Sequence, residues 1–110
     1  MPSLLNSLRI DPDISRAWSV PAHFYTDPAV FTQERERIFA RSWQVVGHQS
    51  QLAKAGDFFT TELQAEPLLL VRNAHGKLRG FYNVCRHRAG PPAQGCGSRK
   101  LFRCAYHGWT

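Results

Sequence analysis

Two short stretches, "CRHRAG" at residues 85–90 and "CAYHGW" at residues 104–109, decide how this chain is interpreted. Each holds one cysteine and one histidine, and sixteen residues separate the first histidine from the second cysteine. Each also follows a run typical of a β-strand, so both stretches are expected on loops that meet at one tip of a β-sandwich. The sequence therefore predicts a metal site made of Cys85, His87, Cys104 and His107.

The chemistry of these four side chains narrows the choice of metal. Thiolates and imidazoles suit zinc or an iron–sulfur cluster better than calcium or magnesium, which prefer oxygen. Zinc fingers usually present two cysteines before two histidines, whereas cysteine and histidine alternate here. A two-iron cluster with both imidazoles on one iron needs each loop to give its cysteine to one iron and its histidine to the other. The alternation favours that cluster, and a zinc-binding structural module stays open as an alternative.

The two stretches resemble the C-x-H and C-x2-H boxes of Rieske proteins, and the distance between them is usual for that family. Four more stretches resemble the N-terminal part of the α-subunits of Rieske non-haem iron oxygenases of the ring-hydroxylating dioxygenase type. They are "DPAVFTQERERIFARSWQVVGH" (27–48), "GDFFTTEL" (56–63), "PLLLVRN" (67–73) and "LRGFYNVCRHRAG" (78–90). The resemblance covers the chain from about residue 23 to its end.

The resemblance implies a mainly β fold. We expect a Rieske-type antiparallel β-sandwich with a cluster-binding tip, incomplete at the C-terminus because its closing strands would follow Thr110. An N-terminal arm and one α-helix (1–42) are expected to precede the Rieske domain (43–110). The resemblance also implies that the catalytic domain, with its mononuclear non-haem Fe(II), lies outside this chain, so no catalytic residue is assigned here.

The function implied by the resemblance is that of the electron-accepting part of an oxygenase. Electrons would come from a ferredoxin or flavin reductase and pass through the [2Fe-2S] cluster to the mononuclear iron, where O2 hydroxylates an organic substrate. The full-length α-subunit would form a homo-oligomer, expected as a trimer. A stand-alone Rieske-type ferredoxin is the alternative. Monooxygenases and dioxygenases share these features, so the substrate stays open.

The reduction potential of such a cluster also has an expected range. Two thiolates balance the charge of an oxidised two-iron, two-sulfide core, so an added electron is accepted more easily than with four thiolates, at roughly −150 to +300 mV. High-potential Rieske proteins carry two further cysteines that bridge the loops, and Gly90 and Tyr106 stand at those positions here. The resemblance therefore implies the lower end of the range.

The regular elements expected around the motifs are one helix and five strands. The helix is expected over "TDPAVFTQERERIFARSW" (26–43), with Asp27 as N-cap, Pro28 at the first helical position, and Val30, Phe31, Ile38 and Phe39 on one face. A tight turn, "NAHG" (73–76), indicates a hairpin. The strands are expected at 43–47, 57–63, 67–73, 77–84 and 100–103.

Composition limits the partners and the location. The net charge is +6, but the basic residues form no long run and no recognisable nucleic-acid motif, so nucleic acid is not expected. A denser basic group surrounds the motifs and is interpreted as a solvated face or a rim that steers an acidic electron donor. Its members are Arg86, Arg88, Arg99, Lys100 and Arg103.

No stretch approaches membrane-spanning length, and the N-terminus fits neither a secretory signal nor a transit peptide, so a cytoplasmic location is expected. Thiols stay reduced there, which favours metal ligands over disulfides. The third cysteine, Cys96, is interpreted as a free thiol on a loop. Of the remaining histidines, His23 and His48 are expected to be structural, and His75 is expected to be a solvated turn residue.

Overall fold

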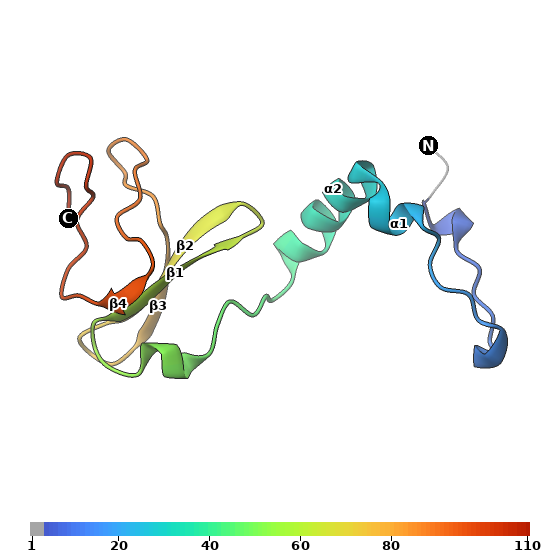
Figure 1. Cartoon of the computed structure of the whole chain (residues 1–110), viewed down its shortest axis with the longest axis horizontal. Helices are drawn as coiled ribbons and strands as arrows, with labels where there is room; N and C mark the ends of the chain where they lie inside the picture. Colours follow the sequence, from blue (N-terminus) through green and yellow to red (C-terminus); the bar gives the residue numbers. More distant parts are fainter. Residues whose placement is uncertain (1–3) are drawn as a thin grey trace. The chain divides into compact units, whose positions relative to one another are not determined.

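The structure, a computed structural model, describes residues 4–110, which divide between Trp43 and Gln44 into two compact units (Figure 1). The first unit contains short helices: 3-10 helices at Leu4–Ser7, Ile14–Arg16 and Phe39–Arg41, α1 (His23–Thr26) and α2 (Pro28–Arg37). The second contains a 3-10 helix at Gln49–Leu52 and the strands β1 (Asp57–Leu63), β2 (Glu66–Arg72), β3 (Leu78–Tyr82) and β4 (Cys96–Ser98).

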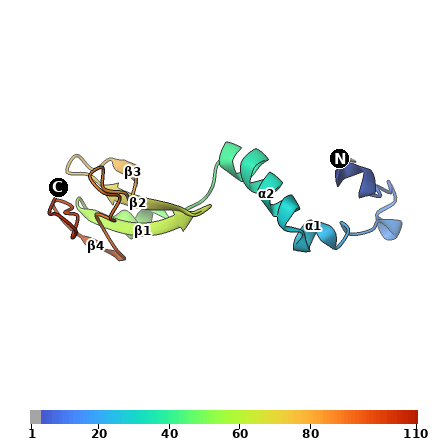
Figure 2. The same cartoon turned by 90° about the horizontal axis from the view of Figure 1, so that it is seen from above.

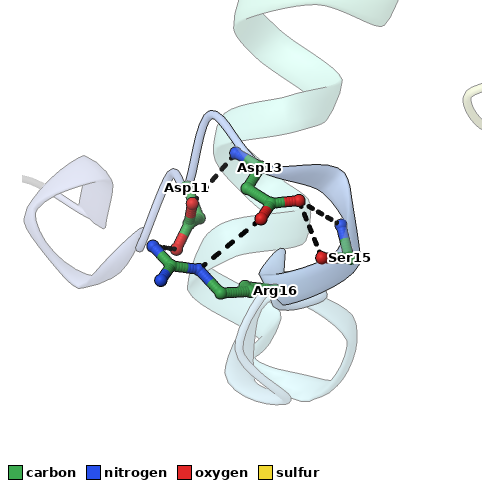
Figure 3. Close-up of polar contacts among 4 residues, drawn as sticks. All are labelled: Asp11, Asp13, Ser15 and Arg16. Carbon is green, nitrogen blue, oxygen red and sulfur yellow. Dashed lines mark hydrogen bonds and ion pairs between the residues drawn. The ribbon is translucent and has the colours of Figure 1, made fainter.

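Local polar contacts order the segment around Asp13 in the first unit (Figure 3). The Asp13 carboxylate accepts hydrogen bonds from the Ser15 hydroxyl (2.7 Å) and the Ser15 backbone N–H (3.0 Å). The hydroxyl, and then the amide, lower the pKa of Asp13. Arg16 pairs with Asp11 at 3.2 Å in an exposed position, where an ion pair contributes little. The expected N-terminal arm thus contains a capped 3-10 turn.

Helix α2 begins where the sequence predicts. The Asp27 carboxylate accepts the Ala29 N–H at 2.8 Å, and Pro28 occupies the first turn, where a missing N–H costs nothing. The expected continuation to Trp43 is wrong, because the helix ends at Arg37 and a 3-10 turn follows. Of the expected apolar face, Val30 is buried, whereas Phe31 and Ile38 are more than half exposed.

The second unit is built on an antiparallel sheet, seen from two directions in Figures 1 and 2. Within residues 4–110 the sheet has four strands in the order β3-β2-β1-β4, which confirms the expected antiparallel β fold. The turn between β2 and β3 is the predicted one: the Asn73 side-chain oxygen accepts the N–H groups of His75 and Lys77. His75 is exposed in that turn.

The turn between β1 and β2 has no sequence signal. Gln64 and Ala65 lie in the left-handed region, with φ of 55° and 67°, and join two strands that pair at Leu63 and Glu66. Two-residue hairpin turns of this kind usually use Asn-Gly, because the Cβ of most residues is strained there by about 1–2 kcal/mol per residue, whereas glycine has no Cβ and asparagine can form a compensating local hydrogen bond. The hydrogen bonds between β1 and β2 therefore stabilise a turn conformation that Gln64 and Ala65 do not favour by themselves.

Two expected strands are absent from the described residues. Residues 43–47 and 100–103 have no strand structure, and β4 lies at 96–98 instead. Val45 is almost fully exposed, so its β-branched side chain gains none of the packing that makes such residues favour strands. Cys96 is free and exposed, but it pairs with Phe59 in the sheet, so the expectation of a loop position is wrong.

The core of the second unit joins the sheet to the segments that carry the motifs. Phe58, Leu69 and Val71 from β1 and β2 pack with Ala93, which lies between the two motifs. Phe102, just before the second motif, packs against the same cluster, its ring edge-on to Phe58 at 5.1 Å. Both motif loops are therefore connected to one core.

Candidate metal centre

The loop of residues 85–90 is closed by two backbone hydrogen bonds. The Cys85 N–H donates to the Gly90 carbonyl, and the Ala89 N–H donates to the Cys85 carbonyl, both at 2.8 Å. Ala89 has a φ of 58°, in the left-handed region that residues with a Cβ rarely adopt. The chain thus turns back on itself within six residues, with Cys85 at the base of the turn.

The loop of residues 104–109 repeats this pattern atom for atom. The Cys104 N–H donates to the Trp109 carbonyl at 2.8 Å, and the Gly108 N–H donates to the Cys104 carbonyl at 2.9 Å. Gly108 has a φ of 77° at the position that Ala89 holds in the first loop. The two loops are therefore two copies of one backbone turn, although they place the histidine third in one copy and fourth in the other.

The four predicted ligands come together as two pairs of like residues. Cys85 and Cys104 are buried, and the Cys104 side chain lies close enough to the Cys85 sulfur to help lower the pKa of that thiol. The rings of His87 and His107 have their centroids 4.6 Å apart, and both histidines are exposed. Figure 1 shows the two loops side by side at one end of the sheet. Among the described residues, no three His, Cys, Asp or Glu side chains are grouped closely enough to hold a metal ion as they stand.

The surroundings of Cys85 favour its thiolate. The His87 backbone N–H, which lies beside the sulfur, lowers the pKa of the Cys85 thiol. Burial acts in the opposite direction, and the Cys104 side chain and the Arg88 backbone N–H add to the lowering. The backbone of the first loop therefore stabilises the charged form that a metal ligand needs.

Each loop also touches a ligand of the other through its sixth residue. A Cβ on Gly90 would lie 3.2 Å from the Cys104 sulfur, so only glycine leaves that sulfur its present space. The Trp109 ring stacks on the His87 ring with centroids 4.8 Å apart and planes 6° apart. Trp109 thus lies beside the site, and the contacts between the loops are reciprocal.

Asn83 holds the first loop to the core, and the sequence analysis does not single it out. Its side chain is buried, donates to the Ala93 carbonyl at 2.8 Å and accepts the Ala93 N–H at 3.1 Å. Its own N–H donates to the Pro67 carbonyl on β2 at 2.7 Å. The only signal in the sequence is a polar residue that ends an apolar strand two positions before Cys85.

The other histidines make contacts that fit structural roles. His48 caps the 3-10 helix at Gln49–Leu52, with its Nδ1 within 2.8 Å of the Ser50 hydroxyl. In the first unit, the His23 Nε2 lies 3.3 Å from the Ser7 hydroxyl. None of the helices in residues 4–110 has the length and apolar character needed to cross a membrane.

A family model described as the Rieske [2Fe-2S] domain matches residues 42–110. The chain belongs to this family, whose description names the cofactor that the two motifs predict. The match begins close to the start of the second compact unit and includes both motif loops.

Relatives place the chain near oxygenase subunits. It is 47% identical over 95 residues to the carnitine monooxygenase oxygenase subunit of Escherichia coli K12, covering 86% of this chain and 25% of that protein. It is 44% identical over 103 residues to the biphenyl 2,3-dioxygenase α-subunit of Rhodococcus jostii RHA1, covering 93% of this chain and 20% of that protein. The chain thus spans about a quarter or less of these relatives.

A solved structure agrees with the sequence relatives. A quaternary ammonium Rieske monooxygenase, described with inter-subunit electron transfer, superposes with a TM-score of 0.80 and 41% identity. The superposition covers 84% of this chain and 26% of that one. The expected Rieske-type fold is thus shared with about a quarter of this solved oxygenase chain.

Proposed function

We propose that Cys85, His87, Cys104 and His107 hold one [2Fe-2S] cluster, with the cysteines on one iron and the histidines on the other. One observation carries the proposal: the structure pairs cysteine with cysteine and histidine with histidine. A Rieske cluster needs this pairing because two histidines replace two cysteines on a single iron. A lone zinc ion needs all four side chains around one point.

The residues around the four ligands fit such a cluster. The two sulfurs are buried, the pKa of the Cys85 thiol is lowered by the His87 N–H, and Gly90 leaves room beside the Cys104 sulfur. When bound, the cluster accepts and releases one electron. Without a disulfide between the loops, since Gly90 and Tyr106 occupy the positions of the bridging cysteines, we expect the lower end of the Rieske potential range.

For the whole protein we propose a Rieske oxygenase. In it, residues 1–42 form the arm and helix, residues 43–110 belong to the Rieske domain, and a mononuclear non-haem iron domain lies elsewhere in a longer chain. The similarity to oxygenase subunits supports this division. The substrate would be an organic molecule that is hydroxylated with O2, either a quaternary amine or an aromatic compound, since the relatives' names include carnitine and biphenyl.

The partners follow from the same proposal. A ferredoxin or a flavin reductase would supply the electrons, and the full-length subunit would assemble into a homo-oligomer, with a trimer as the first state to test. The inter-subunit electron transfer named for the structural neighbour supports an oligomer. A cytoplasmic location is proposed because all three cysteines are free.

The cluster proposal is tested by analysing protein purified without oxygen. We expect about two irons and two sulfides per chain and the visible absorbance of a Rieske cluster. Electron paramagnetic resonance of the reduced protein should show nitrogen hyperfine coupling from two histidines. One zinc per chain without sulfide would refute the proposal.

A further inference from the structure

Positive charge is concentrated in the half of the chain that carries the proposed ligands. All eight acidic residues lie at or before Glu66, whereas eight of the 14 Lys and Arg residues follow it. Within residues 67–110, all of which the structure describes, no basic side chain pairs with a carboxylate. This region therefore has a positive field that the chain does not neutralise itself.

Three of these cations lie on the connection between β4 and the second loop. Arg99, Lys100 and Arg103 are all exposed. The Arg99 backbone N–H donates to the Gly56 carbonyl at 2.9 Å, and its guanidinium lies over the Phe58 ring, 5.2 Å from the centroid. Arg99 is thus held by the core, with a charged group at the surface.

A hollow beside this connection reaches the site itself. It has a volume of about 380 Å³, and Arg99 and Arg103 line it together with Gly90 and Cys104. Arg99 also lines a second hollow, of about 640 Å³, together with Lys100, Phe81 and Phe102. A group that enters the first hollow meets two guanidinium groups and a residue that carries one of the proposed ligand sulfurs.

We propose that Arg99, Lys100 and Arg103 form the docking surface for an acidic electron-donor protein, whose carboxylates enter the hollow beside Cys104. This inference rests on the proposed function and adds the place where the donor binds. One electron leaves the reduced donor and is accepted at the site, and no bond forms or breaks. The donor belongs to the class of acidic iron–sulfur or flavin proteins.

The shape and position of the surface favour such a donor over nucleic acid. A hollow of this size admits one or two carboxylate side chains, whereas phosphate backbones bind along extended basic grooves. The hollow also borders Cys104, so a donor seated there lies close to the point of electron entry. Opposite charges would speed the encounter, and salt would weaken the effect.

The experiment compares two variants of the cluster-loaded, full natural chain. One carries Arg99→Gln, Lys100→Gln and Arg103→Gln. Its control carries Arg35→Gln, Arg37→Gln and Arg41→Gln, which removes the same charge from exposed positions in the other unit. Stopped-flow absorbance follows reduction by a reduced plant-type [2Fe-2S] ferredoxin across ionic strength, and by photoreduced deazariboflavin, a small reductant without net charge.

We expect the first variant to lose about tenfold in second-order rate at low salt and most of its salt dependence, and the control to change by less than about twofold. Both should react with the small reductant like the parent. Equal losses in both variants, or none in either, would overturn the docking surface. A chain that holds no cluster, or that the small reductant does not reduce, would instead refute the proposed function.

Two further outcomes would assign the surface to another occupant and overturn the proposal. The first is a short DNA duplex that binds through the same three residues and leaves ferredoxin kinetics unchanged. The second is resistance of the Lys100 amine to acylation in the full natural chain without a donor. That result would show that another part of the same protein covers the surface. Rapid acylation of Lys100 that slows ferredoxin reduction would support donor docking.

Discussion

The loops 85–90 and 104–109 share a backbone but differ in what they carry and in how they are supported. Both have six residues and the same two closing hydrogen bonds. The first continues from β3 through Asn83, which is fixed to the core, whereas the second follows an irregular segment held by the packing of Phe102. The difference in spacing between C-x-H and C-x2-H is therefore a difference in where the histidine sits on one common turn.

That comparison separates ligand chemistry from backbone geometry. The same hydrogen-bonded turn positions the cysteine in both loops. The histidine is the third residue of the first loop and the fourth residue of the second, so its place on the turn differs. Substitutions at equivalent positions of the two loops should therefore have similar effects on cluster binding and stability when they alter the shared turn. Their effects should differ when they alter contacts that only one loop makes.

Removing either cysteine ligand should abolish cluster binding. Cys85→Ser and Cys104→Ser replace thiolates with hydroxyls that stay protonated and bind iron weakly, so iron and sulfide content should fall at least about tenfold in both. Colorimetric iron and sulfide assays measure this. Cys96→Ser is the matched control and should keep its cluster, because Cys96 lies exposed on β4. Loss of the cluster in the control alone would contradict the assignment.

Asn83→Ala should break the support that only the first loop has. It leaves the N–H and the carbonyl of buried Ala93 without partners, which should cost about 3 kcal/mol of unfolding free energy. Urea unfolding followed by the cluster absorbance measures the loss. Asn73→Ala is the comparison, since its two hydrogen bonds lie in an exposed turn and should be worth about 1 kcal/mol. Equal losses would mean that Asn83 has no special role.

Gly90→Ala and Gly108→Ala should differ in kind. A methyl group on Gly90 would press on the Cys104 sulfur, so we expect a loss of about 1–2 kcal/mol and a shifted cluster absorbance. Gly108 has open space around its Cβ position but a φ of 77°, so its substitution should cost about 1 kcal/mol with an unchanged spectrum. The reverse pattern of spectra would show that the contact at Gly90 is unimportant.

Ala89→Gly should make the first loop more like the second. Glycine removes left-handed strain of about 1–2 kcal/mol but adds about 0.5–1 kcal/mol of chain entropy in the unfolded state. The net expectation is a gain of about 0.5 kcal/mol, or a few degrees in Tm by calorimetry. A lower Tm would mean that the Ala89 methyl group makes a contact worth more than the strain.

Sequence reasoning worked where a residue type has one strong local meaning. Asp27 followed by Pro28 marks the start of α2, and Asn73 marks the turn before β3. The Cys and His boxes predict residues that the structure brings together, and their role as ligands stays a prediction. Each of these signals acts over a few residues. Their effect therefore does not depend on what the rest of the chain does.

Prediction from the sequence was wrong where tertiary contacts determine the secondary structure. The Gly-rich "QGCGS" has low strand propensity, yet Cys96 and Gly97 pair with β1 because Phe58 and Phe59 lie opposite them. The runs at 43–47 and 100–103 have the composition of strands but find no partner in the described residues. The side-chain hydrogen bonds of Asn83 depend on Ala93, ten positions away, and no local sequence pattern predicts such a bond.

The reciprocal contacts between the loops bear on protein engineering. Gly90 borders Cys104, and Trp109 stacks on His87, so each motif completes the other's environment. A designer who grafts only one box onto a new scaffold, and supplies the other two ligands from unrelated loops, would omit half of these contacts. The transplantable unit is both six-residue turns together, with the intervening segment that fixes their spacing.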